Sequence, residues 1–185
     1  METAFPPSRI PLTHAQLIRR NMKDVYAAFD CIDSDRERLR EFLPWVDSNK
    51  SAEDQVWYVG ECAKDWDAGR LFDFGIHTAE GEFAGAIGIH NIAWDHHRCE
   101  LGYWLHQKYE GQGLISSSVQ ALEKVLFDLG FNRIEIRCDP RNTKSASVPT
   151  RNGYRFEGVL HQDVMFAGQF RDSAVYAKLS SDLKR

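Results

Sequence analysis

The sequence predicts a single domain built on a mixed α/β sheet in which most neighbouring strands run antiparallel. Strand-like segments follow one another between residues 71 and 105, which indicates an antiparallel meander. A strand–helix–strand unit then spans residues 99–138, and a crossover of this kind makes its two strands parallel. The chain ends in a short helix and a hairpin, so the pattern is not that of a repeated βαβ fold.

Length and composition fit this domain and exclude several classes of protein. The 185 residues are 43% hydrophobic and carry a formal net charge of -4. They fit one domain over residues 1–185, and the mildly acidic balance argues against nucleic acid as a partner. No apolar run reaches the ~20 residues of a membrane span, and residues 1–9 hold no signal-peptide core, so we expect a cytoplasmic protein. The cysteines are widely spaced without a C-x-x-C motif, so neither a metal site nor a disulfide framework is expected.

The first third of the chain is predicted to be mainly helical. In order, we expect a loose segment (residues 1–11), an edge strand (15–19) and helices over residues 23–32, 34–42 and 51–69. Prolines make the first segment irregular, and Pro44 ends the second helix. Ser51 and Asp54 form a capping-box-like start for the third helix, and Gly69 suits its end.

The middle of the chain alternates between strand and helix patterns. Strands are expected over residues 71–77, 83–89 and 99–105, with a hairpin turn at residues 79–81. A helix follows Gly113, because Ile115, Val119, Leu122, Leu126 and Leu129 recur at helical spacing, and it ends at Gly130. Residues 133–138 alternate between charged and apolar side chains, which is typical of a strand with one buried face.

The last part holds a short helix and two strands. The helix is expected over residues 143–152, and the strands over residues 154–160 and 173–179 with a turn near Gly168. Pro149 lies inside this helix and has no N–H. The sequence therefore predicts that the carbonyl of Ser145, four residues earlier, lacks its helical partner.

A glycine-containing loop joins the strand at residues 99–105 to the following helix. Gly111 and Gly113 place unpaired backbone N–H groups at the positive end of the helix dipole, an arrangement that binds phosphate. The alternative is a glycine turn without a ligand. A dinucleotide fingerprint is disfavoured because Ser116 stands where a third glycine is needed, and no Gly-Lys-Ser/Thr follows for a P-loop.

Several spaced motifs together resemble the GNAT superfamily of acetyl-CoA-dependent N-acetyltransferases. They also resemble its branch of ribosomal-protein amino-terminal serine or alanine acetyltransferases, and the resemblance covers most of the chain. The motifs are residues 100–105 (ELGYWL), 109–115 (YEGQGLI), 142–145 (NTKS), Val148, 151–154 (RNGY), 157–158 (EG), 42–46 (FLPWV) and 163–176. The resemblance implies the GNAT fold, a predominantly antiparallel sheet with one central parallel strand pair and flanking helices.

The resemblance also implies a site for acetyl-CoA. The loop residues Glu110, Gly111, Gln112, Gly113, Leu114 and Ile115 correspond to the family's diphosphate-binding motif. Glu110 stands where the family has Gln or Arg, and Ile115 where it has a small residue. Because backbone amides bind the diphosphate, we expect the Glu110 side chain to point away from it. The pantetheine arm is expected to bind backbone near Trp104 and Leu105, where the central strand splays from its parallel neighbour.

The resemblance points to two residues for the chemistry. Glu100 lies where several family members place a general base, and the alternative is a solvated or salt-bridged carboxylate; His90 and Asp163 are rival bases. The family often has a Tyr in this helix that protonates the CoA thiolate, and residues 143–152 hold none. The serine-acetyltransferase branch offers Ser145 instead, which can hydrogen-bond the CoA sulfur. Asn142 is expected to bond the pantetheine. Helix N-capping is the alternative for both Asn142 and Ser145.

The acceptor is a primary amine, and the resemblance favours the N-terminal amine of a ribosomal protein. Alternatives are a small amine such as a polyamine or an antibiotic, or an acyl-CoA-binding regulatory domain without turnover. Trp45, His90 and Asp163 are candidates for the acceptor side, with core packing or an exposed loop as the alternatives. A homodimer is expected by family analogy alone.

Overall fold

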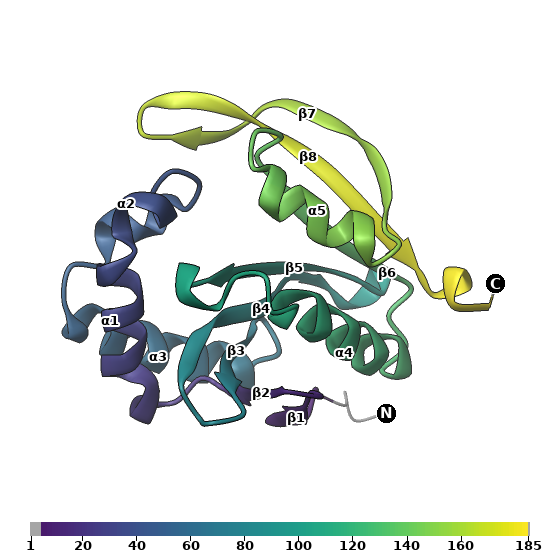
Figure 1. Cartoon of the computed structure of the whole chain (residues 1–185). Helices are drawn as coiled ribbons and strands as arrows, with labels where there is room; N and C mark the ends of the chain where they lie inside the picture. Colours follow the sequence, from purple (N-terminus) through teal and green to yellow (C-terminus); the bar gives the residue numbers. More distant parts are fainter. Residues whose placement is uncertain (1–4, 185) are drawn as a thin grey trace.

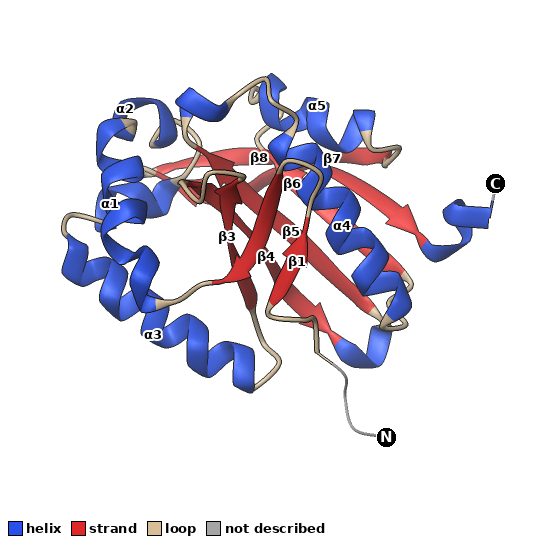
Figure 2. Ribbon diagram, turned by 60° about the horizontal axis from the view of Figure 1, so that its bottom comes forward, coloured by secondary structure: helices blue, strands red, loops and turns tan. Residues whose placement is uncertain are grey.

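The computed structural model describes residues 5–184 and is built on one eight-stranded sheet (Figures 1 and 2). Its strands are β1 (Arg9–Pro11), β2 (Ala15–Arg19), β3 (Phe72–Thr78), β4 (Phe83–Ala93), β5 (Arg98–Leu105), β6 (Arg133–Cys138), β7 (Arg155–Phe166) and β8 (Gln169–Leu179). Their order in the sheet is β1-β2-β3-β4-β5-β6-β8-β7. The central pair β5–β6 is parallel and the other pairs are antiparallel, which confirms the predicted fold class.

Helices flank this sheet. They are α1 (Val25–Ser34), α2 (Arg36–Leu39), α3 (Ala52–Asp67), α4 (Leu114–Asp128) and α5 (Thr143–Arg151), with 3-10 turns at η1 (Met22–Asp24), η2 (Pro44–Ser48), η3 (Trp94–His96), η4 (Gln107–Tyr109) and η5 (Ser180–Lys184). Helix α1 contacts β4, α3 contacts β3 and α4 contacts β5, whereas α5 contacts β6, β7 and β8 (Figure 1). None of the helices between residues 5 and 184 has the length and apolar character of a membrane span.

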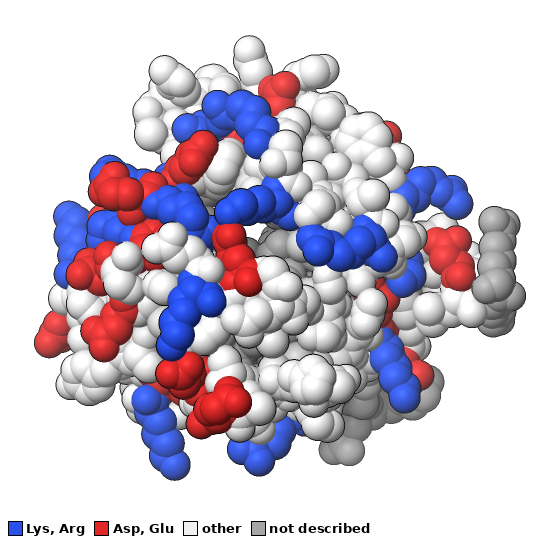
Figure 3. Space-filling view, in the orientation of Figure 1, with Lys and Arg blue, Asp and Glu red and all other residues white. Residues whose placement is uncertain are grey.

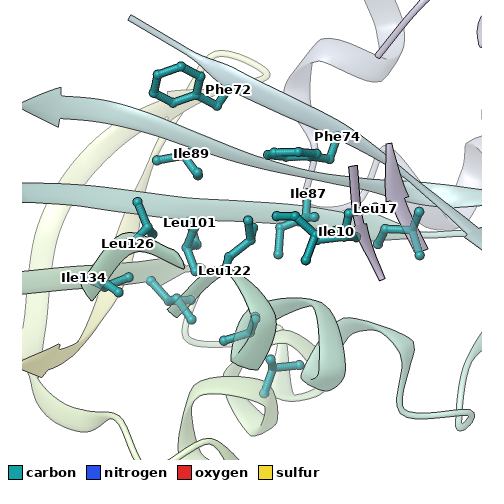
Figure 4. Packing of buried hydrophobic residues seen from close by; sticks show 14 of the residues in the cluster. Ile10, Leu17, Phe72, Phe74, Ile87, Ile89, Leu101, Leu122, Leu126 and Ile134 are labelled. Atoms are coloured by element: carbon teal, nitrogen blue, oxygen red, sulfur yellow. The ribbon is translucent and has the colours of Figure 1, made fainter. Parts of the chain in front are cut away.

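The two faces of the sheet differ because strand side chains alternate. Phe72, Phe74, Ile87, Ile89 and Leu101 belong to the main core, together with Leu122 and Leu126 of α4 (Figure 4). The intervening positions point to the opposite face, beneath α1 and α3. There Tyr58 of α3 reaches Asp73 of β3, and Ala28 of α1 packs against Ala86 of β4. The two faces of the sheet therefore present different side chains on either side of the central strands.

Three predicted elements in the first part of the chain differ from the structure. Arg9–Pro11 of the segment expected to be loose forms the edge strand β1, because Ile10 is buried; residues 1–4 of that segment lie outside the described part. Strand β2 is therefore not an edge strand. The helix expected over residues 34–42 is reduced to α2, which ends at Leu39, so Pro44 does not end this helix but starts η2.

The C-terminal hairpin is longer than predicted. Strands β7 and β8 run up to the two-residue turn Ala167-Gly168, where both residues have positive φ (47° and 78°). A turn of this kind matches the twist of a hairpin. The arm is longer because pairing resumes at residues 164–166 after a register shift at the polar residues 161–163, and this polar interruption hides the continuation of the strand from apolar alternation.

The parallel pair β5–β6 separates beyond its middle. Paired positions run from Arg98↔Arg133 to Leu101↔Ile136 and then end, whereas β5 continues to Leu105 and β6 to Cys138. Residues 102–105 of β5 therefore have no partner on the β6 side. This is the splay that the family resemblance implied.

Candidate active site

The splay between β5 and β6 opens into a cavity of about 1350 Å³. The cavity is lined from both faces of the sheet, by residues of β3, β4 and β5 and by the N-terminal ends of α4 and α5. In the space-filling view this face is hollowed in the middle, with basic and acidic side chains around the hollow (Figure 3). Its size exceeds the few hundred Å³ of a small pocket, so it can hold an extended ligand.

The glycine loop supplies unpaired amides at one end of the cavity. Gly111 and Gly113 have φ of 77° and 75°, and Gly113 is the N-cap of α4 without a side-chain cap. The first helical bond runs from the N–H of Ser117 to the carbonyl of Gly113 (2.9 Å), so the amides of residues 114–116 have no helical partner. Residues 114–116 line the cavity. Gln112 does not line it, and its side-chain amide donates to the Lys108 carbonyl (3.4 Å).

Glu110 lies between two cations at this end of the cavity. Its carboxylate oxygens accept hydrogen bonds from Arg38 (3.0 Å) and Lys144 (2.6 Å), and all three residues line the cavity. The pair of cations neutralises the carboxylate beside the glycine loop. A glutamate at this position is therefore compatible with an anionic ligand, because the ligand would meet two positive side chains as well.

The backbone of β5 offers polar groups to the splay. The N–H of His106 donates to the carbonyl of Ala84 in β4 (2.9 Å), and Trp104 pairs with Ala86. The backbone groups of Tyr103 and Leu105 therefore face the other way, toward the splay. The carbonyl of Leu105 already accepts from Arg38 (2.7 Å). Of the two residues expected to bind the pantetheine arm, Leu105 turns its backbone groups toward the splay, whereas Trp104 pairs with β4. Tyr103 is the other residue whose backbone groups face the splay.

Glu100 and His90 lie side by side on the α1–α3 face of the sheet, since they pair across β4 and β5. The Glu100 side chain is 12% exposed; it accepts from the amide of Asn91 (2.9 Å) and lies 3.6 Å from Arg137. Gly102 is in regular pairing, so it is not a bulge. Instead, a Cβ at Gly102 would lie 2.6 Å from Nε2 of His90, so glycine makes room for the imidazole.

Ser145 lies on the opposite face, on α5. Its N–H donates to Oδ1 of Asn142 (3.0 Å), which confirms the N-capping interpretation of Asn142. Its carbonyl, which Pro149 leaves without a helical partner, accepts from the hydroxyl of Tyr103 (3.1 Å). The Ser145 hydroxyl lies 3.5 Å from the same Tyr103 hydroxyl and faces the cavity.

Tyr103 is a polar residue of the site whose position the sequence analysis missed. Burial raises the pKa of its hydroxyl well above the usual range, so the hydroxyl stays protonated and can donate. Alternation along β5 was the available signal, because it puts Tyr103 on the face opposite Glu100. Cys138 lines the cavity nearby, and burial raises the pKa of its thiol.

The candidates for the acceptor side differ in whether they line the cavity. Trp45 lines the cavity and packs on Trp104, with 5.9 Å between ring centroids. Asp163 is exposed on β7 and does not line the cavity, so the structure does not bring it to the site. Arg20 and Asp73 line the cavity although no sequence motif marks them. Within residues 5–184, no group of three or more His, Cys, Asp or Glu is arranged to hold a metal ion.

Comparisons with known proteins identify the family. The family profile described as an acetyltransferase (GNAT) domain matches residues 16–155, most of the chain. A Bacillus subtilis (strain 168) protein described as a putative ribosomal N-acetyltransferase, YdaF, is 28% identical over 171 residues, 86% of this chain and 88% of the relative. The ribosomal-protein-serine acetyltransferase of Escherichia coli (strain K12) is 35% identical over 101 residues, 54% of this chain and 56% of the relative.

A solved structure agrees with these relatives. RimL, described as a ribosomal L7/L12 alpha-N-protein acetyltransferase in complex with coenzyme A, superposes with a TM-score of 0.88. It is 26% identical, and the match covers 92% of this chain and 97% of RimL. The profile match, the eight-stranded sheet with one splayed parallel pair and the loop of free amides agree. The chain belongs to the GNAT family and is an acetyl-CoA-dependent N-acetyltransferase.

Proposed function

We propose that this enzyme transfers the acetyl group of acetyl-CoA to the N-terminal α-amine of a protein, and that the acceptor is a ribosomal protein beginning with serine or alanine. The observation that carries the proposal is the splay between β5 and β6, which has Glu100 on one face of the sheet and Ser145 on the other. The names of the relatives YdaF and RimL support a ribosomal acceptor.

Donor binding rests on the loop and the splay. The free amides at the N-terminus of α4 bind the diphosphate, as helix N-termini bind anions generally. Arg38 and Lys144 add positive charge at the same end. The backbone groups that β5 turns toward the splay, at Tyr103 and Leu105, then hold the pantetheine arm, which places the thioester beside Gly102.

Glu100 serves as the general base. A free α-amino group has a pKa near ~8, so near neutral pH most of it carries a proton that must leave before attack. Glu100 accepts this proton directly or through a water, and its neighbour His90 is the alternative acceptor. Asn91 and Arg137 hold the carboxylate in place.

Ser145 acts on the leaving group. When the amine attacks the thioester carbonyl, the C–S bond breaks and the CoA sulfur leaves as a thiolate. The Ser145 hydroxyl donates a hydrogen bond to this sulfur, and the protonated Tyr103 hydroxyl beside it supports the orientation of Ser145. A hydrogen-bond donor is needed at the CoA sulfur because negative charge develops there as the C–S bond breaks.

Steady-state kinetics with Glu100→Gln and Ser145→Ala test these roles. Acetyl-CoA consumption is measured with peptides that begin with Ser, Ala or Gly and with spermidine. We expect N-terminal peptides to be acetylated, and kcat to fall by about 10²–10⁴ in Glu100→Gln, the usual range for losing a general base. Because Ser145 contributes a single hydrogen bond, its loss should lower kcat by about tenfold.

His97→Ala is the matched control, since His97 lies in the turn before β5 and does not line the cavity. Full activity of both site variants would contradict the assigned roles. Turnover of spermidine alone would make the enzyme a small-amine acetyltransferase. Tight binding of CoA without turnover of any amine would indicate an acyl-CoA-binding regulatory domain instead of an enzyme.

Location and partners also belong to the proposal. A cytoplasmic enzyme without direct nucleic-acid binding is supported by the net charge of -4 and by the absence of a spanning helix in residues 5–184. A homodimer is proposed by family analogy. Light scattering of the purified protein tests it, and a monomer at micromolar concentration would contradict it.

A further inference from the structure

A row of four residues crosses the α1–α3 face of the sheet and ends at the splay. Arg20 follows β2 and donates its backbone N–H to the carbonyl of Asp73 in β3 (3.0 Å). Asp73 pairs with Gly88 of β4, and Gly88 pairs with Gly102 of β5. Directly opposite residues place their side chains on the same face, so a charged pair stands at one end of a row whose other members are glycines.

The charged pair is buried and only partly satisfied. Arg20 and Asp73 are 4% and 5% exposed, and both line the cavity. Arg20 donates to Gln55 (2.8 Å), and Tyr58 donates to Oδ2 of Asp73 (3.1 Å). One group is available to a ligand: no hydrogen bond from residues 5–184 reaches Oδ1 of Asp73, whereas Nε of Arg20, also without a partner in these residues, is enclosed by protein. A carboxylate oxygen that lines a cavity without a protein donor can accept a hydrogen bond from a ligand.

The free carboxylate oxygen lies close to the reacting region. A Cβ on Gly88 would lie 3.0 Å from Oδ1 of Asp73, and a Cβ on Gly102 would lie 2.6 Å from Nε2 of His90. Such opposite Cβ positions are about 5 Å apart in an antiparallel pair. The Asp73 carboxylate and the His90 imidazole are therefore neighbours on the α1–α3 face of the sheet. Glu100 lies beside His90 on the same face.

The chemistry of the pair selects a neutral hydrogen-bond donor, because the guanidinium of Arg20 already acts on the Asp73 carboxylate as a counter-charge. A second cation would meet the charge of Arg20, and a carboxylate would meet Asp73. A hydroxyl can donate to Oδ1 of Asp73. In an N-terminal serine the hydroxyl is separated from the α-amine by only two carbon atoms, which suits an amine held at His90 and Glu100.

We propose that Asp73, with Arg20 beside it, is the specificity-determining residue that binds the hydroxyl of an N-terminal serine in the acceptor. The inference rests on the proposed function, because it assumes an N-terminal amine as acceptor. An alanine N-terminus leaves Oδ1 of Asp73 without this donor. A site built to hydrogen-bond a substrate hydroxyl rejects the analogue that lacks it, so the enzyme prefers serine to alanine.

The test compares two peptides that differ only in Ser or Ala at the first position. For the wild type, kcat/KM for the serine peptide should exceed that for the alanine peptide by about tenfold or more, the worth of a hydrogen bond to a charged group. Asp73→Asn should lower this ratio by about tenfold and leave kcat/KM of the alanine peptide within about threefold of wild type. Tyr58→Phe, which removes one support of the carboxylate, should lower the ratio less.

Asp24→Asn is the matched control: Asp24 is also a buried carboxylate (7% exposed), is held by His77 (3.0 Å), and does not line the cavity. Circular dichroism checks that each variant is folded, and if Asp73→Asn is not folded, Tyr58→Phe carries the test. An unchanged ratio in the folded Asp73 or Tyr58 variant overturns the inference, as does an equal loss for both peptides. If the wild type acetylates neither peptide, the proposed function itself has failed, and the inference with it.

Discussion

Glu100 depends on an unusual neighbour in β4. Asn91 has a positive φ of 49°, at the point where the register between β4 and β5 shifts. Asparagine tolerates this conformation better than most residues. The irregularity turns the Asn91 amide toward β5, where it donates to Glu100 (2.9 Å). Asn91 is therefore a positioning residue for the proposed base.

Replacing Asn91 tests this hydrogen bond. Asn91→Gly keeps the backbone conformation without strain and removes only the side-chain donor. A carboxylate that loses a donor is held less firmly, so kcat/KM should fall by about tenfold. Asn91→Asp puts a like charge beside Glu100 and should lower kcat/KM at least as much.

His97→Gly serves as the comparison for Asn91→Gly. His97 also has a positive φ (50°), and it does not line the cavity. Its variant should leave kcat/KM unchanged. If Asn91→Gly and His97→Gly lower kcat/KM equally, Asn91 acts only on the backbone.

At the scale of elements, β6 combines a structural ion network with one wall of the splay. Glu135 is buried on this strand and accepts from Arg133 (2.7 Å) and Arg137 (2.8 Å). Burial by itself would raise the pKa of Glu135, but the hydrogen bonds from Arg137 and Arg133 outweigh it and hold the pKa below its usual value. The network fixes β6 on the side from which β5 diverges.

Glu135→Gln measures the contribution of this network to stability. A carboxyl group with a lowered pKa in the folded state stabilises the fold above its ordinary pKa, and that stability is lost as the pH falls. We expect a loss of about 2 kcal/mol in the free energy of unfolding at pH 7. The difference between variant and wild type should shrink as the pH falls through the lowered pKa of Glu135, so that it is clearly smaller at about pH 3 than at pH 7.

Urea unfolding at the two pH values makes the comparison. Glu157→Gln is the control, because Glu157 binds Arg133 from an exposed position on β7 and surface pairs contribute under about 1 kcal/mol. A loss that is equal at both pH values would show that Glu135 acts through packing and not through its charge.

At the scale of the whole molecule, one core joins the two parts of the site. The main cluster of buried residues runs from Ile10 in β1 to Tyr154 ahead of β7, and it includes residues of β3, β4, β5, β6 and α4. The splay lies in the middle of this continuous sheet, between its parallel strands. We therefore propose that residues 1–185 fold as one cooperative domain.

Thermal unfolding tests the single domain. Circular dichroism and tryptophan fluorescence should give coincident transitions with one midpoint. Acetyl-CoA binds only the folded state, so a concentration of 100 Kd should add about 2.7 kcal/mol to the free energy of unfolding and raise the midpoint. Two separate transitions, or a ligand shift confined to one of them, would contradict a single domain.

Local patterns determined the type and order of the elements. Helical spacing in α4, alternation in β6 and the glycines of the loop are properties of neighbouring residues, so they can be identified without a fold. The motifs placed the same loop, Glu100 and Ser145 at one site, and all of these residues except Gln112 line the cavity. The position of Pro149 also predicted that the carbonyl of Ser145 lacks its helical partner. It did not predict that the Tyr103 hydroxyl donates to this carbonyl.

Only the tertiary structure determined which distant residues meet at the splay. Tyr103 reaches Ser145 across 42 positions of sequence, and Arg38 reaches Glu110 across 72. The pairing of Arg20, Asp73, Gly88 and Gly102 in one row depends on the register of four strands. Register is set by packing of the whole sheet, because a slip of one residue moves every side chain to the other face. The sequence by itself therefore determined the family, the donor and the proposed chemistry, whereas the row beside the acceptor could be identified only in the folded sheet.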